Sequence, residues 1–116
     1  MATKKEGDML HVIMDAQHNL LEEQKIILRE TFRDMPVRAW MVPKEGLSKY
    51  QIKDMALTIS NMGGPVVFVS PVPLLIKMLS RSLDSVWIFF NSKHEKKKLP
   101  NGKIIYTIPK KGWQLV

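Results

Sequence analysis

Apolar residues occur along the chain in two alternating patterns: short unbroken runs, and longer stretches with an apolar residue every three or four positions. Unbroken runs bounded by turn residues are typical of buried strands, whereas the longer spacing is typical of helices with one buried face. The runs predict four strands, at residues 9–14, 37–42, 66–69 and 86–90. The stretches between them predict three helices, at residues 20–35, 49–62 and 70–79.

Local signals mark the ends of the first two helices. Asn19 or His18 is the expected cap of the first helix, and Pro36 is expected to stop it. Ser48 and Gln51 have the spacing of a capping box, in which each side chain accepts the backbone N–H of the other residue. The second helix is therefore expected to begin just after Ser48.

The third helix follows Ser70, its expected N-cap, and is apolar over most of its circumference. Such a helix lies either in the middle of the core or at a dimer surface. After the fourth strand, residues 103–108 are expected to pair with that strand or its extension, and residues 112–116 to add a short edge piece.

The element order β-α-β-α-β-α-β predicts an α/β fold, a Rossmann-like three-layer sandwich with a mostly parallel sheet and a C-terminal antiparallel hairpin. Residues 1–8 are expected to form a disordered leader and residues 9–116 a single domain. The chain has 45% hydrophobic residues, no cysteine and no apolar run of the roughly 20 residues that span a membrane. We therefore expect a cytoplasmic protein with no membrane partner.

The net charge of +7 is concentrated near the C-terminus, where seven lysines between positions 93 and 111 face the single acid Glu95. Such a field favours an anionic partner such as a nucleotide or a nucleic acid. The lysine run at residues 96–98 also fits a solvated hairpin arm that keeps the protein soluble.

Polar residues follow each predicted strand, and the carboxyl ends of parallel strands meet at one edge of the sheet, where ligands bind in open α/β folds. Residues 15–19, 43–44, 70 and 91–94 are expected to gather there. The candidate ligand-binding residues are Gln17, Asn19, Ser70, Asn91 and Ser92. The candidate catalytic residues are His18, Lys93 and His94, although His18 also fits a helix cap or a surface imidazole.

Several kinds of site are unlikely on sequence grounds. No glycine-rich phosphate motif follows the first strand, which argues against a dinucleotide cofactor or a P-loop. Three scattered histidines without cysteine and no paired carboxylates argue against a zinc or two-metal site, so neither a metal nor a cofactor is expected. Ser70 precedes a proline and lacks the glycine-flanked elbow of serine hydrolases.

Serine, asparagine, lysine and histidine around a basic crevice can bind a phosphodiester without a metal. A lysine or a helix N-terminus would hold the phosphoryl oxygens, and a histidine would carry a proton to the leaving oxygen. If the ligand is RNA-like, its own 2′-hydroxyl can be the nucleophile.

Two segments resemble the small standalone CRISPR-associated ring nucleases. Residues 17–24, QHNLLEEQ, look like the "SHELTEEQ" type of opening in that family. Residues 91–103 resemble its strand end with Ser/Thr and Lys/Arg followed by an "LPDG" hairpin, and His18, Ser92 and Lys93 match motif positions. Residues 69–73, VSPVP, depart from the family's glycine-rich turn after the third strand.

The resemblance implies a homodimer related to the CARF sensors that cleaves cyclic oligoadenylates and so switches off type III CRISPR signalling. Two alternatives remain: a module that binds a nucleotide signal without cleaving it, and a small basic RNA-binding protein that uses the lysine hairpin. DNA is not expected as a partner. The stacking aromatics of an RNA-binding surface are exposed, whereas Trp87, Phe89 and Phe90 lie in a strand that is expected to be buried on both faces.

Overall fold

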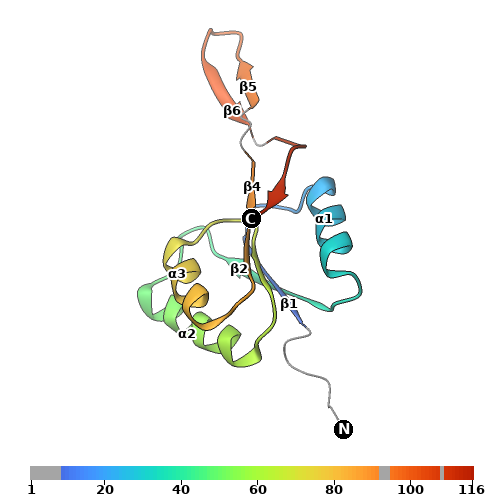
Figure 1. Cartoon of the computed structure of the whole chain (residues 1–116). Helices are drawn as coiled ribbons and strands as arrows, with labels where there is room; N and C mark the ends of the chain where they lie inside the picture. The colour runs from blue at the N-terminus through green and yellow to red at the C-terminus, as the bar shows by residue number, and fades with distance from the viewer. Residues whose placement is uncertain (1–8, 92–94, 108) are drawn as a thin grey trace.

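The computed structural model describes residues 9–91, 95–107 and 109–116, so the predicted leader at 1–8 lies outside the described residues. The chain is an α/β protein with a mostly parallel five-stranded sheet of order β2-β1-β3-β4-β7 and a separate antiparallel pair, β5-β6 (Figure 1). Its elements in chain order are β1 (Leu10–Asp15), α1 (Glu22–Phe32), β2 (Val37–Val42), α2 (Lys49–Met62), β3 (Val66–Phe68), α3 (Pro73–Ser82), β4 (Val86–Phe90), β5 (Glu95–Lys98), β6 (Ile104–Thr107) and β7 (Gln114–Leu115).

The predicted strands are confirmed, with small shifts at their ends. β2 and β4 have the predicted bounds, β1 begins and ends one residue later than predicted, and β3 ends one residue earlier. β6 pairs with β5, which extends the chain beyond β4, and β7 pairs antiparallel with β4 as a short edge piece. The β5-β6 hairpin projects away from the sheet (Figure 1).

Alternating residues of the strands supply two cores, one on each face of the sheet. On one face Leu10, Val12 and Val67 pack with Leu28 of α1. On the other face the buried side chains come from the intervening strand residues and from α2 and α3; they include Ile13, Phe68, Ile52, Ile59 and Leu75. Figure 1 shows α1 on one side of the sheet and α2 and α3 on the other.

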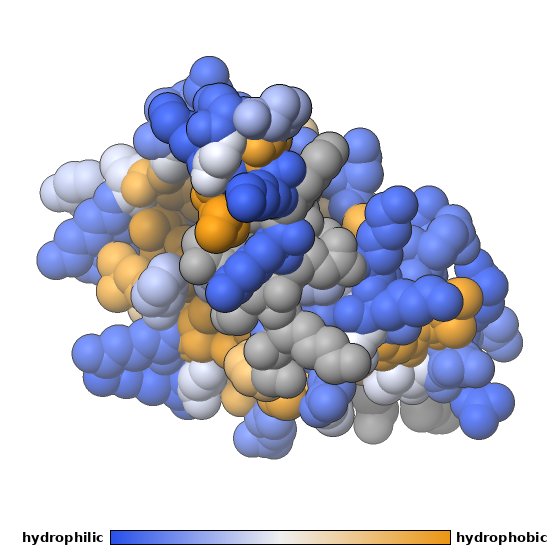
Figure 2. All heavy atoms as spheres, turned by 90° about the horizontal axis from the view of Figure 1, so that it is seen from above, coloured by the Kyte–Doolittle hydropathy of each residue, from blue (hydrophilic) through white to orange (hydrophobic). Residues whose placement is uncertain are grey.

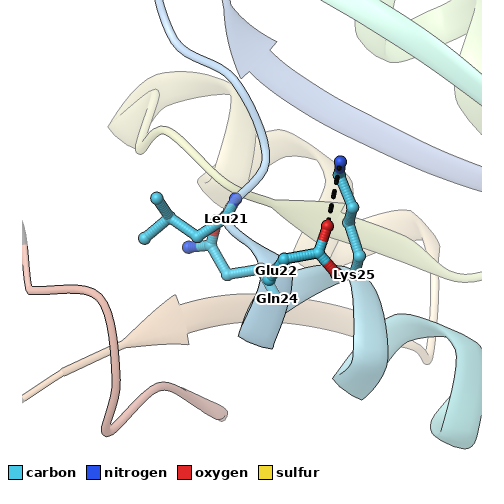
Figure 3. A network of polar contacts seen from close by, with 4 residues as sticks. All are labelled: Leu21, Glu22, Gln24 and Lys25. Atoms are coloured by element: carbon cyan, nitrogen blue, oxygen red, sulfur yellow. Dashed lines mark hydrogen bonds and ion pairs between the residues drawn. The ribbon is translucent and has the colours of Figure 1, made fainter.

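The predicted caps of the first helix are wrong. α1 begins at Glu22, with Leu21 at the N-cap, so neither His18 nor Asn19 occupies that position. The backbone N–H of Leu21 donates to Oε1 of Gln24 at 3.0 Å, and Figure 3 shows this turn with the Glu22–Lys25 ion pair. The buried Gln24 side chain thus closes the first turn from inside the helix.

The capping box of α2 is confirmed. The backbone N–H of Gln51 donates to Oγ of Ser48 at 3.1 Å, and the N–H of Ser48 donates to Oε1 of Gln51 at 2.7 Å. At the other end of the helix, Gly63 adopts φ +72°, a value that is costly for residues with a Cβ.

α3 buries its apolar side chains within its own chain. Leu75 and Leu79 are fully buried, and Leu74, Ile76 and Met78 are half-buried against the same cluster. The exposed residues of this helix are Pro73, Lys77, Ser80, Arg81 and Ser82. The helix therefore completes the core beneath the sheet.

The prediction that β4 is buried on both faces is wrong. Only Phe89 is buried; Val86, Trp87 and Ile88 are half-buried, and Phe90 is 49% exposed. The two-residue strand β7 covers only the last part of β4, and the chain leaves the sheet after Phe90. The strand therefore lies near the margin of the sheet.

No helix in the described part of the chain is long and apolar enough to cross a membrane.

His11 lies in β1, which is paired on both sides in the sheet, and is fully buried. Its Nδ1 accepts the indole N–H of Trp40 at 3.0 Å, and its Nε2 lies 2.8 Å from the carbonyl oxygen of Gly63. One nitrogen accepts and the other donates, so the ring is neutral. Burial lowers the pKa of His11 below 6.5; the hydrogen bond to Gly63 opposes this shift, and the charge of Arg38 adds to it.

The lowered pKa predicts a pH-dependent stability. The contribution of His11 is complete above pH 6.5 and decreases as the pH falls from there toward the lower pKa of the folded state, because the unfolded chain then binds a proton that the folded chain does not. The variant His11→Gln keeps one acceptor and one donor but does not titrate. Its free energy of unfolding in urea should change less between pH 7.5 and pH 5.5 than that of the wild type. Equal changes in both proteins would contradict the assignment.

Candidate functional site

A cavity of about 370 Å³ opens where the carboxyl ends of β1 and β3 meet the start of α1. Six of its lining residues come from the segments that follow β1 and β3, two from the start of α1 and one from the C-terminal tail. They are Gln17, His18, Asn19, Val69, Ser70 and Pro71, then Leu21 and Gln24, then Trp113. The sequence-predicted residues Gln17, His18, Asn19 and Ser70 are therefore brought together.

Ser70 links the two strand ends. Its Oγ accepts the backbone N–H of Asp15 at 2.9 Å and lies 3.3 Å from Nδ1 of His18. Because the Asp15 N–H occupies one lone pair of this oxygen, the hydroxyl hydrogen remains free to point at the imidazole. Ser70 is buried, whereas His18 is exposed and lines the cavity. The buried serine thus orients the exposed histidine ring through its contact with Nδ1.

The expectation that Ser70 caps the third helix is wrong. α3 begins at Pro73 with Val72 at the N-cap, and no side chain bonds to this helix end. Pro73 disfavours helical geometry at Val72, which is extended, so the helix starts beyond Ser70 and the serine hydroxyl remains available to Asp15 and His18. The N-terminus of α3, which no side chain caps, begins with the N-cap Val72 directly after the cavity residue Pro71.

Trp113 supplies the aromatic wall of the cavity and was not predicted as a site residue. Its backbone N–H donates to Oε1 of Glu23 at 2.7 Å, and its indole N–H donates to the carbonyl oxygen of Pro109 at 2.9 Å. Its ring also packs edge-on against Phe89, with centroids 6.3 Å apart. A tryptophan in a short C-terminal tail carries no sequence signal for this position, because its contact with Glu23 joins residues 90 positions apart.

A second cavity, of about 470 Å³, adjoins the first at Leu21 and is lined by equal numbers of acidic and basic side chains. Leu21 and Ile26 provide its apolar part, and its charged residues are Glu22, Glu23, Lys110 and Lys111. Viewed from the hairpin end, the surface of the molecule is mostly hydrophilic, with separate hydrophobic areas (Figure 2). Two lysines, Lys110 and Lys111, thus lie next to the cavity that contains His18, together with the two glutamates.

Asn91 has a structural position outside the cavity lining. Its Nδ2 donates to the carbonyl oxygen of Lys111 at 2.8 Å. A Cβ at Gly112 would lie 3.3 Å from Oδ1 of Asn91, and Gly112 has φ +92°, so a glycine is required at this turn. Asn91 thereby holds the turn that presents Trp113.

The remaining predicted site residues either lie outside the described ranges or do not line the cavity. Ser92, Lys93 and His94 lie outside the described residues. The loop at residues 43–44 is described but does not line the cavity. Within the described ranges, no group of three or more histidine, aspartate or glutamate residues lies close enough together to hold a metal ion.

The arrangement suits a ligand that combines a flat ring system with an anionic group. An indole face can stack on a base, an amide and an imidazole can bond polar edges, and nearby lysines attract phosphate. Family models, curated proteins and solved structures were compared with this chain, and none of them matches. The geometry of the cavity is therefore the basis for assigning a function.

The Ser70 hydrogen bond predicts a measurable structural cost. The variant Ser70→Ala leaves the Asp15 N–H without its acceptor, and we expect the free energy of unfolding to fall by about 1–3 kcal/mol. Ser80→Ala, on the exposed face of α3, is the matched control and should change stability by less than about 0.5 kcal/mol. Equal stabilities of both variants in urea unfolding would show that Ser70 does not hold the strand ends together.

Proposed function

We propose that the protein is a ring nuclease that cleaves cyclic oligoadenylates without a metal and so switches off type III CRISPR signalling in the cytoplasm. The observation that carries the proposal is the contact of 3.3 Å between His18 and Ser70 in a cavity that Trp113 also lines. We further propose that the fold is a Rossmann-like three-layer sandwich, with the ligand at the carboxyl edge of its sheet.

Adenine binding is assigned to Trp113 and its neighbours. The indole offers an aromatic face on which a base can stack, an interaction worth about 1–3 kcal/mol per base in nucleic-acid complexes. Gln17 and Asn19 lie in the same lining and carry amides that can bond the edge of the base. Their carbonyl oxygens accept and their amino groups donate, as the edge of adenine requires.

Phosphate binding is assigned to positive charge and free N–H groups. The N-terminus of α3 has no side-chain cap, unlike the start of α2, and its free N–H groups suit an anion beside Pro71. Lys110 and Lys111, which line the adjoining cavity beside Glu22 and Glu23, are the nearest described cations that could bond a phosphate. Lys93, which the family resemblance selects, would supply a further cation after β4.

The bond-breaking step needs only proton transfer and positioning. The 2′-hydroxyl of one nucleotide attacks the adjacent phosphorus, the bond from phosphorus to the 5′-oxygen breaks, and a cyclic 2′,3′-phosphate forms. The proton lost from the 2′-oxygen is balanced by the proton that the 5′-oxygen gains. With Nδ1 of His18 held by Ser70, its Nε2 is the nitrogen that meets the ligand, and His94 is the second candidate for proton transfer.

A second candidate function rests on the β5-β6 hairpin. Lys96 and Lys98 are exposed on β5, Lys103 is exposed in the turn, and the hairpin projects from the sheet (Figure 1). A basic arm of this kind favours single-stranded RNA through its phosphates. This alternative predicts binding that weakens steeply with salt and does not involve Trp113.

The first test is incubation of the purified protein with cyclic tetra-adenylate and cyclic hexa-adenylate in EDTA, with products resolved by chromatography. We expect linear oligoadenylates that end in a cyclic 2′,3′-phosphate. Intact rings that co-elute with the protein would replace the enzyme by a binding module. Intact rings that do not bind, together with salt-sensitive binding of RNA, would favour the hairpin function.

Two variants separate the chemistry from ligand binding. His18→Gln should lower turnover by about 10²–10⁴-fold, the usual contribution of a general acid or base, while ring binding is kept. Trp113→Ala should weaken binding by about 5–150-fold, the equivalent of one lost stacking interaction, whereas Trp113→Phe should restore most of it.

Tyr50→Ala removes an exposed aromatic ring on α2, outside the His18 cavity, and is the matched control with unchanged binding and turnover. Turnover that survives His18→Gln would contradict the role assigned to His18, and equal effects of Trp113→Ala and Tyr50→Ala would contradict the stacking site.

A further inference from the structure

β2 is one of the two edge strands of the five-stranded sheet, and no strand in the described ranges pairs with its outer edge. The N–H of Leu10 donates to the carbonyl of Pro36, and the N–H of Ala16 donates to the carbonyl of Val42, so the even-numbered residues of this segment face β1. Because backbone groups alternate in direction along a strand, the N–H and C=O groups of Val37, Ala39 and Met41 point outward.

This outer edge lacks the devices that usually protect an edge strand. It has no lysine, no proline inside the strand and no inward-pointing charge, and Arg38 is its one charged residue. The side chains of Val37 and Met41 are 60% and 45% exposed, and Ala39 between them is also exposed. An apolar strand with free backbone groups at its edge is a template for pairing with another strand.

We infer that β2 pairs antiparallel with β2 of a second copy of the chain, with Ala39 on the two-fold axis. In this register Ala39 faces Ala39 of the partner subunit, and Val37 faces Met41 of the partner subunit. All of the outward backbone groups are then used, because each of these pairs exchanges both N–H···O bonds. The interface joins the two sheets edge to edge.

Prolines next to the strand select this register. Pro36 belongs to the even-numbered positions that face β1 and leaves the outer edge free, whereas Pro43 belongs to the outward-facing positions and has no N–H to donate. A shift of the register that sets Val37 against Pro43 of the partner subunit therefore loses a hydrogen bond. The centred register uses each N–H that the edge offers.

The one charged residue of the strand also finds a favourable neighbour in this register. Arg38 lies opposite Trp40 of the partner subunit on the other face of the sheet, and a guanidinium beside an indole ring is favourable. The same pair already stacks within one chain, with the guanidinium 4.4 Å from the ring centroid. The lysines of the hairpin follow β4, on the far side of the sheet from β2, so that their mutual repulsion across the interface is small.

The inference does not rest on the proposed nuclease activity, and its test measures mass alone. Sedimentation of the full chain should give twice the monomer mass of 13.4 kDa. Ala39→Lys places two like charges on the axis and should yield a monomer. Leu57→Lys adds the same charge at an exposed position of α2 and is the matched control, which should remain dimeric.

A cross-link tests the register directly. The chain has no cysteine, so Ala39→Cys introduces a single thiol whose partner lies about 5.5 Å away between Cα atoms, within the range that a disulfide spans. Oxidation should give a covalent dimer, whereas Leu57→Cys should give none. A monomeric wild type, or a dimer that survives Ala39→Lys without cross-linking through Ala39→Cys, would overturn the inference. Circular dichroism would confirm that each variant is folded.

Discussion

The structure depends on the two-sided pairing of β1. Its backbone bonds β2 on one side, beginning with the Leu10 N–H to the Pro36 carbonyl, and β3 on the other, beginning with the His11 N–H to the Pro65 carbonyl. Between these ladders the side chains alternate between the two cores. A strand buried on both sides cannot leave a polar group without a partner, which explains why His11 bonds both Trp40 and Gly63.

The same strand sets the position of the cavity. Where the ladder between β1 and β3 ends, the Asp15 N–H finds a side chain instead of a carbonyl, and that side chain is Ser70. The two chain segments diverge beyond this hydrogen bond, and the C-terminal tail returns to close the gap with Trp113. The cavity is thus a direct result of where the parallel pairing stops.

Hydrophobic patterning was sufficient to predict the four parallel strands, the three helices and the gathering of Gln17, His18, Asn19 and Ser70, because these depend on local spacing and on the common direction of parallel strands. The helix caps were harder to predict. The buried Gln24 accepts the Leu21 N–H at the start of α1, and Pro73 keeps Val72 extended, so that α3 starts later than the sequence suggested. Trp113 could not be predicted at all, because its position depends on contacts with Glu23 and Pro109 that only the folded chain forms.

The three tryptophans lie in three distinct places: Trp40 in the edge strand β2, Trp87 against Phe32 in the core, and Trp113 in the cavity wall. Each indole therefore reports a different event through its intrinsic fluorescence. A ring that stacks on Trp113 quenches one emitter and leaves the other two unchanged, whereas unfolding exposes all three to water. Single-tryptophan versions of the chain would make the protein its own optical probe, without an attached dye.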